Sequence, residues 1–156
     1  MSVHLDLRNE SSFRQPCRRD TLGRLAQRVC RDEGMEETVE LSLLFCDDPF
    51  IAGLNQTYRD KKGPTDVLSF GQEPAFAHHF RVLGDIVISL ETVERRCDGD
   101  PQAMNQEVRL LFCHGLLHLL GYTHDRAPKQ AEMQRKQAAY LNIAPEAAWR
   151  TRPDRH

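Results

Sequence analysis

Four short stretches of the chain carry the apolar pattern of β-strands. In the first stretch, Val3, Leu5 and Leu7 are separated by polar residues, and the second alternates in the same way from Val39 to Phe45. Such alternation is typical of a strand that packs one face against a core. The four predicted strands cover residues 3–7, 39–45, 67–70 and 84–89.

Between and after these strands, apolar residues recur every three or four positions, which predicts helices. The first helix has Asp20 or Thr21 as its expected N-cap, and two later ones begin at an Asp-Pro pair, at 48–49 and at 100–101. Aspartate caps a helix N-terminus, and proline fits the first helical position. The five predicted helices cover about residues 22–30, 49–58, 90–96, 101–120 and 128–141.

Strands with helices between and around them predict an α+β fold. We expect a mixed sheet of about four strands packed with about five helices. A chain of 156 residues fits one domain of this kind, so residues 1–156 are taken as a single domain. The residues after about 145 carry several arginines and predict a loose tail.

Composition excludes several classes of protein. The net charge of −2 argues against a generally basic nucleic-acid coat, although it allows a local basic patch. The five cysteines are odd in number and form no C-x-x-C pair, so neither a disulfide framework nor a thiolate zinc finger is indicated. The longest apolar stretch, residues 110–120, contains two histidines and is too short to span a bilayer. No basic region followed by an apolar run begins the sequence, so the expected location is the cytoplasm.

Three of the seven histidines lie close together near the end of the longest predicted helix. His114 and His118 are four residues apart, which places both side chains on one helix face. Gly121 can end the helix and turn the chain sharply, so that His124 swings back toward the other two. Histidines packed in a core are the alternative, but three at this spacing favour a metal site at the end of the long helix.

Neutral imidazole suits zinc, copper, iron and nickel. Three nitrogen ligands leave a tetrahedral zinc ion one open position, which is typical of a catalytic site. Cys113 is a poor fourth ligand, because as the helical neighbour of His114 it points about 100° away. We therefore expect one Zn²⁺ per chain, with a hydrolase's ability to activate water or to polarise a phosphoryl or carbonyl oxygen.

The histidine spacing equals that of the H-E-x-x-H-x-x-G-x-x-H metallopeptidases. In those enzymes the glutamate after the first histidine is the general base for the attacking water. This chain has Gly115 at that position. Peptide hydrolysis by that mechanism is therefore not expected, and the favoured substrate is one for which a metal ion and positive charge suffice.

Two long motifs resemble a known family. Residues 55–70 read N-Q-T-Y-R-D-K-K-G-P-T-D-V-L-S-F, and residues 114–124 read H-G-L-L-H-L-L-G-Y-T-H. These are similar to the N-x-x-Y-R-x-K-x-x-P-T-D-V-L-S-F and H-G-x-L-H-L-x-G-Y-D-H motifs of the bacterial YbeY family of rRNA-maturation endoribonucleases. Order and spacing match from Val3 to about Leu141. Thr123 stands where the family has aspartate, and Gly71 where it usually has proline.

The resemblance implies a zinc-bearing α+β fold and single-strand-specific cleavage of RNA. It also implies roles in 3′-end maturation of 16S rRNA and in ribosome quality control, with the ribosome or its proteins as partners and neither DNA nor a membrane. The metal ligands would be His114, His118 and His124. Arg59 would be the catalytic or RNA-positioning arginine, and the neighbouring Lys61 and Lys62 would extend a cationic track for substrate.

Two other functions stay open from the sequence alone. One is a zinc hydrolase of a peptide or amide, and the other is a ribosome-associated binding module whose metal is only structural. Arg59 likewise has an alternative role, as a turn residue paired with Asp60 or Asp66.

Overall fold

The computed structural model describes residues 1–72 and 80–149. Its sheet has four strands in the order β1-β2-β4-β3. Strands β1, β2 and β4 are parallel, and β3 pairs antiparallel with β4 at the edge, so the sheet is mixed as expected. The strands are β1 (Val3–Asn9), β2 (Thr38–Cys46), β3 (Val67–Gly71) and β4 (Phe80–Ser89).

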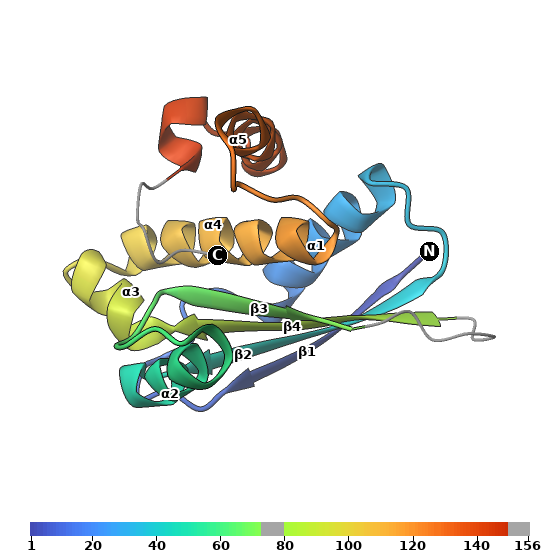
Figure 1. Ribbon diagram of the computed structural model, residues 1–156. Coiled ribbons are helices and arrows are strands. Elements are labelled where there is room, and N and C mark those ends of the chain that lie inside the picture. Colours follow the sequence, from blue (N-terminus) through green and yellow to red (C-terminus); the bar gives the residue numbers. More distant parts are fainter. Residues whose placement is uncertain (73–79, 150–156) are drawn as a thin grey trace.

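Five α-helices accompany the sheet and confirm the α+β prediction. In Figure 1, α1 and α4 cover one face of the sheet, α5 lies on the outer side of α4, and α2 lies on the opposite face. None of the described helices has the length and hydropathy to cross a membrane. The helices are α1 (Arg19–Asp32), α2 (Asp48–Arg59), α3 (Leu90–Arg96), α4 (Pro101–Leu119) and α5 (Ala127–Leu141), followed by the short 3₁₀ helix η1 (Pro145–Ala148).

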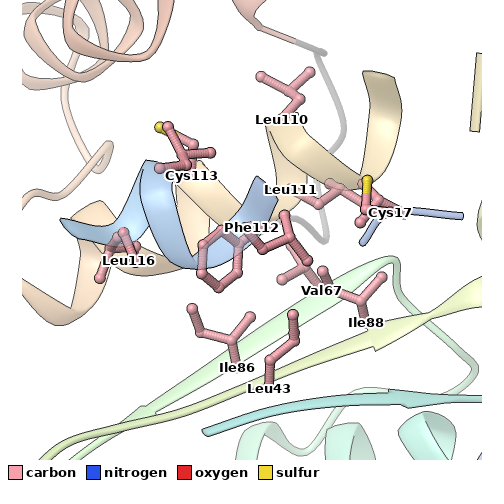
Figure 2. Packing of buried hydrophobic residues seen from close by; sticks show 14 of the residues in the cluster. Cys17, Leu43, Val67, Ile86, Ile88, Leu110, Leu111, Phe112, Cys113 and Leu116 are labelled. Atoms are coloured by element: carbon pink, nitrogen blue, oxygen red, sulfur yellow. The ribbon is translucent and has the colours of Figure 1, made fainter. Parts of the chain in front are cut away.

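The main core lies between the sheet and α4. Figure 2 shows Leu43 of β2 and Ile86 of β4 pointing toward Phe112 of α4, and all three side chains are fully buried. A smaller cluster, which includes Ile51, fills the space between the sheet and α2. The middle of α4 is therefore held firmly on the sheet, and this helix carries the first two histidines of the candidate site.

Strand β4 begins at Phe80, four residues before the predicted start at Gly84. Gly84 lies inside the strand, where the pairing with β2 shifts register and leaves Leu83 without a partner in the ladder. Glycine in a strand often marks such a bulge rather than a strand end, which explains the error. Residues 73–79, which precede this strand, lie outside the described part of the chain.

Two predicted N-caps are wrong, and one is confirmed. Helix α1 begins at Arg19, so neither Asp20 nor Thr21 is its cap. Helix α2 begins at Asp48, one residue earlier than predicted, so Asp47 and not Asp48 is the N-cap residue. The Asp48 carboxylate instead accepts hydrogen bonds from Ser89, Thr92 and Arg95. Asp100 caps α4 as predicted and accepts a hydrogen bond from the backbone N–H of Ala103.

The expected loose tail is wrong for residues 145–149. Pro145–Ala148 form η1, and Ala148 is fully buried. The Gln137 side chain of α5 donates a hydrogen bond to the Ala148 carbonyl oxygen, and Trp149 packs its ring against two histidines of the candidate site. The apolar Ala148 and Trp149 thus anchor residues 145–149, whereas the arginines behind the prediction of a loose tail all lie after Trp149. Residues 150–156 lie outside the described part of the chain.

Replacing Gly84 with alanine is expected to lower the melting temperature sharply. A Cβ atom at position 84 would lie 2.1 Å from the Phe70 carbonyl oxygen. The backbone of Gly84 also has a φ of +142°, which side chains rarely allow. Strain and overlap together should cost about 3 kcal/mol, or about 6–12 °C in a domain of this size. The matched control is Gly23→Ala inside α1, where a Cβ meets nothing within 4 Å. That control should raise stability slightly, and equal melting temperatures for the two variants would contradict the packing described here.

Candidate metal centre

The three histidines predicted from the sequence come together at the end of α4. Each offers a ring nitrogen, and these atoms lie within 4.8 Å of one another, so the cluster can hold a metal ion. The ring centroids of His114 and His118 are 4.7 Å apart, and those of His118 and His124 are 4.9 Å apart. His114 is fully buried, while the other two are half-buried.

The local sequence explains how the third imidazole returns to the first two. The backbone N–H of Gly121 donates to the His118 carbonyl oxygen, and that of Tyr122 donates to the Leu117 carbonyl oxygen. This pair of bonds is a Schellman motif, which needs a residue with positive φ just after the helix. Gly121 has a φ of +104° and meets that need. The chain therefore reverses within three residues and brings His124 back beside His118.

Two hydrogen bonds orient the helical imidazoles. Nδ1 of His118 lies 2.9 Å from the Tyr122 carbonyl oxygen, which can only accept, so Nδ1 carries the proton. Nδ1 of His114 lies 2.8 Å from Oε1 of Gln137. Because the Gln137 amide nitrogen donates to the Ala148 carbonyl, its oxygen faces the imidazole and accepts. In both rings Nε2 is then the atom with a lone pair, as a metal ligand requires.

The environment of the cluster fits a cation and disfavours a proton. The three Nε2 atoms are buried, and that of His118 has no hydrogen-bond partner among residues 1–72 and 80–149. Burial lowers the pKa of His118 to about 4, and the charge of His124 adds to this, while the bond to the Tyr122 carbonyl opposes it. His118 is thus neutral at pH 7, which is the form that binds a metal ion.

Three residues that sequence reasoning missed support the cluster from outside. Trp149 places its ring 5.2 Å from His114 and 5.3 Å from His124, measured between ring centroids. Gln137 is fully buried on α5. One sequence signal marks Gln137, because it lies at helical spacing between the buried Met133 and Tyr140, where an apolar residue is expected. Nothing in the sequence near Trp149 marks its role.

The third of these residues, Glu33, follows α1 and fixes the loop that carries His124. Its carboxylate accepts hydrogen bonds from the Tyr122 hydroxyl at 2.7 Å, from Lys136 at 3.1 Å and from the Tyr140 hydroxyl. Burial tends to raise the pKa of Glu33, but these hydrogen bonds outweigh it and hold the pKa below its usual value. Glu33 therefore stays ionised and ties α1, α5 and the Tyr122 loop together.

The residue before His124 is Thr123, where the motif quoted above has aspartate. Thr123 is exposed, and its hydroxyl donates a hydrogen bond of 3.1 Å to the Asp125 carboxylate. The side chains on either side of His124 are thus bonded to each other at the surface.

Arg59 ends α2 and is half-buried. Its Nη1 donates to Oδ1 of Asn55 at 3.3 Å, and the buried Asn55 amide donates to the Gly63 carbonyl oxygen at 3.0 Å. Asp66, one of the two alternative partners weighed for Arg59, accepts hydrogen bonds from Arg96, which also pairs with Glu107.

One pocket of about 520 Å³ brings Arg59 and His118 together, although they are far apart in the sequence. Its remaining lining comes from the end of α2, from β3 and from the end of α4. Lys61 and Lys62 are exposed and are not among the described residues that line it. The full lining is Tyr58, Arg59, Leu68, Ser69, Phe70, Gly71, His118 and Leu119.

Packing explains the glycine that replaces the metallopeptidase glutamate. Gly115 is buried in α4 over the sheet, and a Cβ atom there would lie 3.1 Å from Ile86. A glutamate at this position would enter the core between α4 and β4. The site is thus built without a carboxylate next to His114.

Replacing Gln137 with leucine is expected to weaken metal binding about 10- to 100-fold, because Nδ1 of His114 loses its acceptor. Titration with zinc against a competing chelator measures the affinity. The matched control is Gln134→Leu, which lies on the same helix and loses a hydrogen bond to the Pro145 carbonyl instead of one to His114. Equal zinc affinities for the two variants would contradict this role of Gln137.

The chain matches the protein family described as Endoribonuclease YbeY over residues 6–144. Endoribonuclease YbeY of Pelotomaculum thermopropionicum is 43% identical over 124 residues, which cover 77% of this chain and 82% of the relative. The enzyme of the same name from Moorella thermoacetica is 42% identical over 129 residues, covering 78% and 83%.

A solved structure supports the fold. The solution structure of TM1509 from Thermotoga maritima is similar with a TM-score of 0.57 and 24% identity, and the match covers 97% of this chain and 95% of that one. The family match and the identities of the relatives confirm the resemblance found in the sequence. The chain belongs to the endoribonuclease YbeY family.

Proposed function

We propose that this protein is a zinc-dependent endoribonuclease that cleaves single-stranded RNA, with residues 1–156 acting as one catalytic domain. One Zn²⁺ per chain would be held by His114, His118 and His124. The observation that carries the proposal is the shared pocket, in which His118 of the histidine cluster and the Arg59 guanidinium line the same space. Relatives named endoribonuclease support the reaction class.

The chemistry of the cluster matches this reaction. A zinc ion bound there would supply a Lewis acid for a phosphoryl oxygen. Gln137 and the Tyr122 carbonyl bind Nδ1 of two imidazoles, which makes Nε2 the nitrogen with the lone pair in each. The planar Arg59 guanidinium can bind a phosphate through two parallel hydrogen bonds. RNA carries its own nucleophile in the 2′-hydroxyl, so the reaction does not require a carboxylate at position 115.

Lys61 and Lys62 would contribute differently from Arg59. Both are exposed and lie two and three residues after Arg59, so they suit those phosphates of a bound RNA that lie outside the pocket. Such contacts strengthen binding through charge and weaken as salt rises. The site is then a local cationic patch on a protein whose net charge is −2.

A biological substrate can be proposed from the resemblance to the family. We propose the 16S rRNA precursor, cleaved during maturation of its 3′ end, with a further part in ribosome quality control. The ribosome or its proteins would be the partners, and the cytoplasm the location. Neither DNA nor a membrane has a part in this proposal.

The test is a panel of substrates given to zinc-loaded protein. Single-stranded RNA, duplex RNA, single-stranded DNA of the same sequence and casein are incubated with the wild type and with His118→Ala. We expect cleavage of single-stranded RNA alone, and its loss in the variant. Casein cleavage that His118→Ala abolishes would overturn the proposal in favour of peptide hydrolysis. Intact RNA under all conditions would favour a binding module with a structural metal.

A further inference from the structure

An exposed aromatic pair stands beside Arg59. The ring of Tyr58, in the last turn of α2, meets the ring of Phe70 on β3 with centroids 5.3 Å apart and planes at 65°. Tyr58 is 66% exposed, the highest value for any large apolar or aromatic side chain in residues 1–72 and 80–149. Phe50, on the same helix, is 49% exposed and lines a pocket together with Tyr58, so the two rings belong to one exposed apolar surface. Surfaces of this kind often mark a binding site.

The pair belongs to two adjoining pockets. Tyr58 and Phe70 line the pocket that contains Arg59 and His118. They also line a second pocket of about 450 Å³ between α2 and the open face of the sheet. The aromatic pair is therefore the wall that both pockets share, directly next to the proposed phosphate site.

The two pockets differ in charge. The first has the Arg59 guanidinium, which attracts phosphate. The second has the carboxylates of Asp6 and Asp85, and Arg8, the one cation among the described residues that line it, forms an ion pair with Glu10. Because like charges repel, the second pocket disfavours phosphate, while its apolar walls suit an uncharged planar group. A nucleotide placed across the shared wall would therefore put its phosphate on the Arg59 side and its base on the aromatic side.

The ring geometry leaves room for that base. Phe70 supports Tyr58 edge-to-face, so the two rings do not stack on each other. With two-thirds of its surface exposed, Tyr58 keeps a face open for stacking. Every base has a π face, so stacking of this kind accepts any sequence.

We infer that Tyr58, supported by Phe70, stacks on an unpaired base of the RNA whose phosphate Arg59 holds. This inference rests on the proposed function and deepens it, because it supplies the reason for single-strand selectivity. In a duplex, neighbouring base pairs cover both faces of each internal base. Only an unpaired nucleotide can place its base against Tyr58 while its phosphate reaches Arg59.

The test uses zinc-loaded protein and a short single-stranded oligoribonucleotide whose cleavage site has been mapped. For Tyr58→Ala we expect KM to rise about tenfold with a much smaller change in kcat, whereas Tyr58→Phe restores the wild-type KM. With an abasic nucleotide beside the cleavage site, the KM of the wild type should rise by the same factor. The KM of Tyr58→Ala should not change. The fluorescence of 2-aminopurine at that position should be quenched by the wild type and by Tyr58→Phe, but not by Tyr58→Ala.

A control variant and distinct outcomes separate this inference from the proposed function. Phe80→Ala removes another exposed aromatic ring, 40% exposed at the start of β4, and should behave as the wild type. If the wild type cleaves RNA while Tyr58→Ala keeps the wild-type KM and quenching, stacking is overturned and the proposed function stands. If the abasic substitution raises the KM of Tyr58→Ala as much as that of the wild type, the base contacts another part of the protein. The inference is then overturned as well. If the wild type neither binds nor cleaves RNA, both fail together.

Discussion

A variant in which His114 and His118 are both replaced by alanine is expected to hold almost no zinc and to leave RNA uncut. A four-ligand zinc site in a protein is worth about 10–16 kcal/mol, so each ligand contributes about 3 kcal/mol. Loss of two ligands should lower zinc affinity about ten-thousandfold. Elemental analysis of the purified variant measures the bound metal, and a cleavage assay on single-stranded RNA measures the activity.

His4→Ala is the control for this variant. It removes an exposed histidine on β1 that takes no part in the cluster, and it should retain about one zinc ion per chain. A melting curve accompanies both, because removal of the buried His114 leaves the Gln137 oxygen without its imidazole partner. If the double variant still binds one zinc ion per chain, the metal lies elsewhere and the assignment of these ligands is wrong.

The second large effect is expected for Arg59→Glu. The change places a carboxylate in the pocket that His118 lines, where it repels the phosphate that the guanidinium would bind. Loss of one hydrogen-bond donor to a developing oxyanion typically costs about 100- to 1000-fold in kcat, and we expect at least this loss in kcat/KM, because the change also reverses the charge. Arg59→Lys keeps the charge without the planar fork, so a smaller loss, about tenfold, is expected.

Arg135→Glu is the matched control, because it makes the same change of charge at an exposed position of α5. Zinc content and melting temperature should be close to wild type in all three variants. Wild-type cleavage by Arg59→Glu would refute the role in phosphate binding. Lost activity together with a collapsed melting transition would instead assign Arg59 to the support of the loop that Asn55 anchors.

Much of the candidate site could be predicted because its information is local. His114, His118 and His124 lie within eleven residues, and helical periodicity together with one positive-φ glycine is enough to bring them together. The residues at which strands and helices begin were less predictable. Gly84 was read as the start of a strand, although it marks a bulge inside one.

The support of the site could not be predicted because it comes from distant parts of the chain. Gln137 and Trp149 reach the histidines from α5 and from the segment after η1, and Glu33 reaches Tyr122 from the end of α1. Each contact depends on how the helices pack, which no local pattern encodes. The shared pocket of Arg59 and His118 likewise appears only when β3 lies between α2 and α4.

We expect the metal at the three-histidine centre to act in catalysis and not merely to support the fold. The most direct measurement removes zinc with a chelator, records the melting curve, assays cleavage of single-stranded RNA, and then restores zinc. The sheet and α4 are held together by an apolar core that does not involve the histidines, so we expect a cooperative transition to remain. Cleavage should stop without zinc and return when zinc is added. A chain that unfolds when zinc is removed, or one that cleaves RNA equally well without it, would contradict the claim.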